Sequence, residues 1–71
     1  MIRSTKQTRE RLGSKIQKLR RRIDLSQEEF ASKLGISRTH MGHIEQGIKS
    51  LSLKLITKIS KELKTDISDL F

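Results

Sequence analysis

The sequence predicts a compact all-α domain, and three observations support this prediction. The 71 residues contain no proline, and no alternating apolar pattern runs long enough to indicate a sheet. Apolar residues recur instead every three or four positions, as they do along one face of a helix. Capping residues precede several of these periodic segments. We expect a five-helix domain over residues 8–71, preceded by a flexible basic arm at residues 1–7.

The first helix is expected to begin at about Thr8. Its apolar stripe repeats at spacings of four, three and four, and comprises Leu12, Ile16, Leu19 and Ile23.

The next two helices have clear start and stop signals. Ser26 is expected to cap the second helix, and Glu29 completes a capping box. Gly35 ends this helix, because glycine adopts a left-handed backbone at little cost. Ser37 is expected to cap the third helix, which runs to about Gln46 and stops at Gly47. The predicted core of these two helices is Phe30, Ala31, Leu34, Ile36, Met41 and Ile44.

Two further helices complete the predicted fold. Ser52 opens the fourth, whose inward stripe is predicted to be Leu53, Ile56, Ile59 and Leu63. Asp66 can cap a last short helix that packs back through Ile67, Leu70 and Phe71.

Positive charge is concentrated near the N-terminus. The net charge is +8, and residues 1–22 account for it with nine Lys or Arg and one Glu, 9 − 1 = +8. Residues 23–71 carry seven bases and seven acids, which cancel. Such a segment favours a polyanionic partner, and we expect Arg11 and Lys15 to contact phosphates without choosing the sequence.

Several function classes are excluded by composition. Without cysteine, neither a disulfide nor a thiolate zinc site can form. No apolar stretch approaches the roughly 18 residues of a membrane span, and no signal-peptide core is present, so we expect a cytoplasmic protein. No catalytic arrangement or phosphate-binding loop appears, so neither an enzyme nor a cofactor is expected. His40 and His43 lack a nearby acid, so no metal site is expected.

The segment from Leu25 to Gly47 has the spacing of a helix-turn-helix. Two short helices meet at a glycine corner, and the second keeps one face free. In DNA-binding proteins this second helix lies in the major groove. Double-stranded DNA is therefore the expected partner.

The outward residues of the third helix are the candidate DNA readers. With Met41 and Ile44 turned inward, the helical period places the others outward or at the edge. Arginine can grip guanine with two hydrogen bonds, and threonine offers a hydroxyl or a methyl group. The candidates are Arg38, Thr39, His40, His43 and Gln46, with Ser37 at the helix start.

Three flanking positions extend this candidate site. Gln27, in the first turn of the second helix, can bind a phosphate beside that helix's N–H groups. Lys49, in the following loop, can contact a phosphate or a groove. Gly42 can bring the helix close to the groove floor, or can simply accommodate packing within the protein.

The chain resembles the lambda-repressor-like helix-turn-helix family, which includes phage repressors and Cro-type regulators. The resemblance runs from Leu12 to Phe71, through LGSKIQKLR, LSQEEFASKLGISRTHMGHIEQG, SLSLKLITKISKEL and DISDLF. It implies a bacterial or phage-encoded, sequence-specific transcriptional regulator. It also implies a salt bridge between Arg20 and Glu45. The other implied roles are phosphate or base contact by Gln27, phosphate contact by Gln46, and base reading by Arg38, Thr39, His40 and His43.

Within this family, RTHMGHIEQGIKSLSL most resembles the controller proteins of restriction–modification systems. His40 takes the usual aromatic position and Leu51 the usual proline position. Asp24 and Lys64 depart from the family, because each stands where glycine is usual. An alternative is an antitoxin or an adaptor that uses the same fold to bind protein.

Operator symmetry predicts a homodimer. We expect its two-fold interface at an exposed patch of Leu51, Leu55, Leu70 and Phe71. No small-molecule effector is evident in the sequence.

Overall fold

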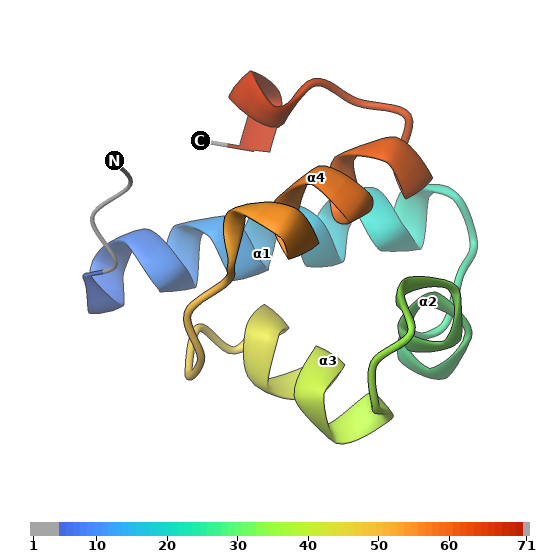
Figure 1. The fold of residues 1–71 in the computed structure, drawn as a ribbon, viewed down its shortest axis with the longest axis horizontal. Helices are drawn as coiled ribbons and strands as arrows, with labels where there is room; N and C mark the ends of the chain where they lie inside the picture. The colour runs from blue at the N-terminus through green and yellow to red at the C-terminus, as the bar shows by residue number, and fades with distance from the viewer. Residues whose placement is uncertain (1–4, 71) are drawn as a thin grey trace.

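Four α-helices and one closing 3-10 helix make up residues 5–70, the part of the chain that the computed structural model describes (Figure 1). No strand occurs in this range, so the predicted all-α class is confirmed. In chain order the elements are α1 (Lys6–Arg22), α2 (Gln27–Leu34), α3 (Arg38–Glu45), α4 (Leu53–Glu62) and η1 (Ile67–Leu70).

The capping signals of α2 and α3 act as predicted. The Ser26 hydroxyl accepts a hydrogen bond from the Glu29 N–H at 3.0 Å, and the Glu29 carboxylate accepts one from the Ser26 N–H at 2.9 Å. Gly35 has a left-handed φ of 73°. The Ser37 hydroxyl then caps α3 by accepting from the His40 N–H at 3.0 Å. Local side chains thus fix both ends of the turn between α2 and α3.

The two ends of the fold differ from prediction. Helix α1 begins at Lys6, because the Thr5 hydroxyl caps it by accepting from the Thr8 N–H at 3.1 Å. Residues 6 and 7 therefore belong to the helix, and residues 1–4 of the expected arm lie outside the described residues. The expected last helix is a four-residue 3-10 helix. Phe71 also lies outside the described residues.

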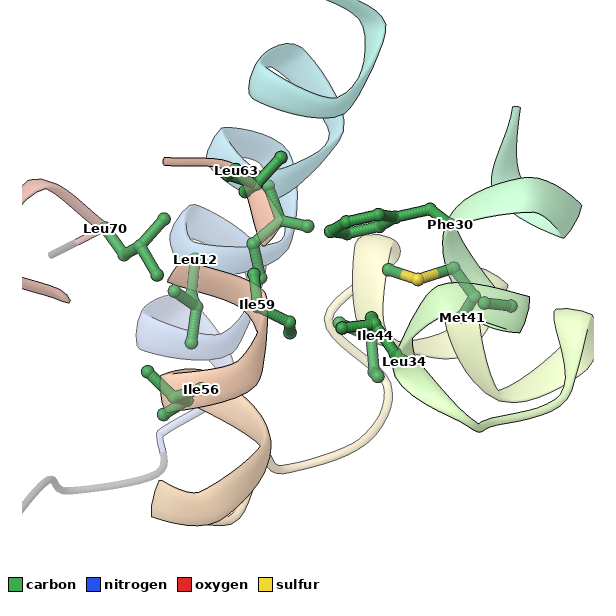
Figure 2. Packing of buried hydrophobic residues seen from close by; sticks show 11 residues of the cluster. Leu12, Phe30, Leu34, Met41, Ile44, Ile56, Ile59, Leu63 and Leu70 are labelled. Atoms are coloured by element: carbon green, nitrogen blue, oxygen red, sulfur yellow. The ribbon is translucent and has the colours of Figure 1, made fainter. Parts of the chain in front are cut away.

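The core forms where α2 and α3 face α4 and α1 (Figure 2). Phe30, Met41 and Ile59 are fully buried. Leu53, predicted to point inward, is instead 65% exposed, because it is the first residue of α4 and lies at the end of the helix. The complete buried cluster is Leu12, Ile16, Phe30, Ala31, Leu34, Met41, Ile44, Ile56, Ile59, Leu63 and Leu70.

The three described members of the predicted dimer patch do not form an exposed surface. Leu70 is only 2% exposed, because η1 packs on α1 and α4 and turns this side chain into the core. Leu51 and Leu55 are half-buried and pack against the same core. The large apolar side chains that solvent reaches in this region are Ile48 and Leu53.

Helix α1 crosses α3 at very short range. A Cβ atom at Gly13 would overlap the Ile44 carbonyl oxygen and would lie 2.7 Å from that of Glu45. Only glycine leaves room for the α3 backbone at this crossing. The approach sets how far α3 stands from α1, and so where its outer face is presented.

Asp24 and Lys64 both adopt a left-handed backbone, with φ values of 58° and 53°. These are the two positions where glycine is usual in the family that the sequence resembles. The turns after α1 and α4 therefore keep the glycine conformation without glycine, at some cost in backbone strain.

Candidate nucleic-acid interface

The outer face of α3 carries an exposed row of polar side chains. Arg38, Thr39 and Gln46 are exposed, whereas His40 and His43 are half-buried. The opposite face is anchored, because Met41 and Ile44 are buried in the core. The core thus holds the helix rigidly while its outer face remains open to a ligand.

The N-terminal turn of α3 suits an anionic ligand. It contains no acidic residue, and the positive end of the helix dipole lies there, which favours negative charge. Ser37 is exposed at this end. Because its hydroxyl accepts the capping bond, its O–H can still donate to a phosphate oxygen.

A buried hydrogen-bonded network stands behind this face. Arg20 of α1 donates to both carboxylate oxygens of Glu45, from Nε at 2.5 Å and from Nη2 at 3.0 Å. Its Nη1 donates to the Leu25 carbonyl oxygen at 2.7 Å. Gln27 Nε2 donates to Glu45 Oε1 at 2.9 Å. The ion pair implied by the family resemblance is thus present, and it links α1, α2 and α3.

The network also removes a charge from the surface. The Glu45 side chain is only 1% exposed and is neutralised by Arg20. A carboxylate next to DNA would otherwise repel phosphate. The amide of Gln27 has two N–H donors, and Glu45 takes one of them. The second can reach outward, since Gln27 is only half-buried.

Lys49 lies exposed in the loop between α3 and α4. This loop is tied to α1, because Arg9 Nε donates to the Gly47 carbonyl oxygen at 3.1 Å. Sequence reasoning missed this tie and the link between Gln27 and Glu45. Both hydrogen bonds join residues that are distant in the chain, so no local sequence pattern predicts them.

The cations of α1 do not form one DNA-facing surface. Arg11 and Lys15, expected to contact phosphates, line a groove between α1 and η1. Successive helical residues are rotated by about 100°, so both lie about 160° around α1 from Gly13. Gly13 is the residue that meets α3. The structure therefore turns these two cations away from α3.

Among residues 5–70, no three His, Asp or Glu side chains gather as metal ligands would. Within the same range, no helix combines the length and apolar character needed to cross a bilayer.

This arrangement of helices matches a known protein family. The helix-turn-helix family HTH_3 matches residues 16–70, which span most of the described chain and include both α2 and α3. The chain belongs to the helix-turn-helix family. It is a DNA-binding transcriptional regulator and not an enzyme.

Individual relatives of this helix-turn-helix protein include controller proteins. It is 44% identical over 62 residues to the control protein C.MunI of Mycoplasma sp, covering 86% of this chain and 84% of that protein. The crystal structure of the restriction-modification controller protein C.AhdI from Aeromonas hydrophila superposes with a TM-score of 0.82 at 32% identity. That match covers 87% of this chain and 94% of C.AhdI.

An antitoxin is also similar, over a smaller share of its length. Antitoxin PezA of Streptococcus pneumoniae serotype 4 (strain ATCC BAA-334 / TIGR4) is 37% identical over 59 residues. The match covers 83% of this chain but only 37% of PezA. The corresponding share of C.MunI is 84%, so the antitoxin alternative has the weaker support.

Proposed function

We propose that this protein controls transcription of a restriction–modification system by binding a two-fold symmetric operator as a homodimer. The observation that carries the proposal is the outer face of α3, which is polar, free of acidic side chains and held by a buried core. A helix presented in this way fits the major groove of DNA.

The controller role is supported by the relatives. The similarity to C.MunI and to C.AhdI extends over more than four-fifths of the length of each relative, so it is not confined to a shared recognition motif. These relatives support a regulator of the same class.

Each side chain of the face takes a role that its chemistry permits. Arg38 and Thr39, exposed in the first turn of α3, read base edges. His40 and His43 read bases from a half-buried position. The phosphate-binding residues are Gln27, Ser37, Gln46 and Lys49.

A homodimer is part of the proposal because one such domain contacts only one half-site. Two half-sites a helical turn apart supply the affinity and specificity that a single small module lacks. The exposed Leu53, which stands 65% open to solvent near the half-buried Leu51 and Leu55, supports an interface at the start of α4.

The test begins with selection of binding sites from random duplex DNA, followed by footprinting. Arg38→Ala is then compared with Lys61→Ala, which removes the same charge from an exposed position in the last turn of α4. Arg38→Ala should weaken binding to the selected site by about 1–3 kcal/mol and relax base preference at one position. Lys61→Ala should bind close to wild type.

Equal losses on the selected site and on random DNA for Arg38→Ala would reject base reading by this residue. Failure of the selection to enrich any sequence would reject an operator-specific regulator. A selected site that lies outside the promoter of a restriction–modification operon would reject the controller role alone.

A further inference from the structure

The side of α1 that faces away from α3 forms an open groove with η1. The groove has a volume of about 790 Å³. Its cationic lining residues are Arg11, Lys15, Lys18 and Arg22, all exposed. Its leucines are Leu12, Leu19 and Leu70. Leu12 and Leu70 belong to the buried core, and Leu19 is half-buried. Neither the core nor the proposed DNA face accounts for the four cations beside them.

The four cations form a stripe along one side of the helix. Relative to Gly13, which meets α3, they lie about 140–180° around α1. Helix α1 itself stands between them and α3. A duplex seated on the outer face of α3 therefore does not reach them, and their charge needs another explanation.

The apolar component of the groove argues against a nucleic acid. Leu19 is half-buried in the groove wall. Ile23, the C-cap of α1, does not line the groove but is 43% exposed next to it in the chain. A phosphate backbone gains nothing from such side chains. An amphipathic helix gains from both parts, because its apolar side chains cover the half-buried Leu19 while its acidic side chains meet the cations.

We propose that this groove binds an acidic, amphipathic helical segment of a partner protein. Charge complementarity selects that occupant, since four cations face the groove and Glu10 is the only acidic residue among those that line it. A second copy of the chain is a poor occupant, because a symmetric contact would bring two such cationic stripes together. The partner can then sit on one side of the protein while DNA sits on the other.

The test uses a labelled helical peptide of about 20 residues, with leucines at helical spacing and glutamates elsewhere. Its control replaces every glutamate with lysine. Binding to the full chain is measured by fluorescence anisotropy, and amide chemical shifts locate the site. The acidic peptide should bind, should shift the outer face of α1 and η1, and should bind more weakly as salt rises.

Two charge-reversal variants separate the groove from general electrostatics. Lys15→Glu/Lys18→Glu alters the groove, whereas Lys61→Glu/Lys64→Glu makes the same change in net charge at exposed positions that neither line it nor lie at the start of α4. The groove variant should lose peptide affinity by about tenfold or more relative to the control variant. The two variants should bind operator DNA equally.

Several outcomes overturn the proposal. The proposal is wrong if the acidic peptide does not bind wild type, if it binds both variants equally, or if it shifts the amide signals of α3 instead. A selective loss of operator affinity in the groove variant would assign the groove to DNA. A selective change in sedimentation of that variant would assign it to self-association. None of these results affects the role of α3, which Arg38→Ala tests separately.

Discussion

Gly42 is a glycine that packing within the described chain does not require. A Cβ atom at this position would meet only Gln27 Oε1, at 3.9 Å, which is ordinary contact. Packing within the chain therefore does not require glycine here, although glycine weakens a helix interior by about 1 kcal/mol. Of the two explanations that the sequence allowed, close approach to the DNA groove is the one that this spacing favours.

We therefore expect Gly42→Ala to separate stability from binding. The variant should raise the free energy of unfolding by about 0.5–1 kcal/mol and weaken operator binding by about tenfold, because a methyl group then stands between α3 and the groove floor. Urea denaturation and a DNA titration measure the two quantities. Ser32→Ala, at an exposed position of α2, is the control and should leave operator affinity intact. Unchanged affinity in Gly42→Ala would contradict close approach.

The buried pair of Arg20 and Glu45 gives a second prediction at this scale. Removing the arginine alone in Arg20→Met leaves a carboxylate that is 1% exposed without its counter-charge. The expected loss is about 3–5 kcal/mol of unfolding free energy. In Arg20→Met/Glu45→Met no buried charge remains, so most of that loss should be recovered. A double-mutant cycle in urea measures the coupling, and additive losses would show that the two residues act independently.

Among the elements, α2 depends most on its cap, because eight residues form only a marginal helix in water. The Ser26 backbone N–H donates to the Glu29 carboxylate and lowers the pKa of Glu29 below its usual 4.5, helped by the Ser26 hydroxyl and by Lys33. A lowered pKa in the folded state stabilises the fold above about pH 4.5. That contribution is lost as the pH falls through the folded-state value.

Glu29→Gln should therefore lower the melting temperature at neutral pH but not in acid. Thermal unfolding followed by circular dichroism from about pH 7 to about pH 3 measures the difference from wild type, which should shrink as the pH falls. Glu28→Gln makes the same change one residue earlier, outside the capping box, and serves as the control. A difference that stays constant over this range would mean that the carboxylate charge does not support the cap.

The sequence predicts a helix boundary well when the residues that cause it are adjacent in the chain. The starts of α2, α3 and α4 were found because Ser26, Ser37 and Ser52 cap them from the adjacent sequence. The start of α1 was missed, although Thr5 is a capping residue, because no apolar residue follows it until Leu12. The prediction that Leu53 points inward was wrong. Periodicity gives the face of a helix on which a residue lies, but not whether neighbouring helices extend far enough to bury it.

The candidate site also has features that the local sequence predicts and features that it does not. The exposed side of α3 follows from the period that buries Met41 and Ile44. Two other features depend on contacts between residues distant in the chain. They are the hydrogen bond from Gln27 to Glu45 and the close crossing of α1 and α3 at Gly13. Only the crossing has a sequence signal, which is a glycine inside a helical pattern. The direction of Arg11 and Lys15 required the position of α3 around α1. Charge counting alone could not supply it.

At the scale of the whole molecule, the sequence predicts a dimer contact at Leu51, Leu55, Leu70 and Phe71. Because Leu70 is buried, we propose that the contact is centred on Leu53 at the start of α4. Leu53→Glu should shift the sedimentation of the protein toward the monomer and weaken binding to the two-half-site operator more than to a single half-site. Because Leu53 is 65% exposed, the fold should be retained, whereas Leu55 packs on the core and is less suitable. Lys54→Glu controls for added negative charge. An unchanged dimer in Leu53→Glu would move the interface elsewhere.

The separation between the anchored and the open sides of α3 has an evolutionary consequence. Met41, Ile44 and Glu45 maintain the architecture, whereas Arg38 and Thr39 make no contribution to the interior. In a duplicated gene, the codons for these exposed residues can therefore change, and the protein can acquire a new target without loss of core stability. Rapid divergence of binding preference among paralogues, on an unchanged backbone, is what such a design allows.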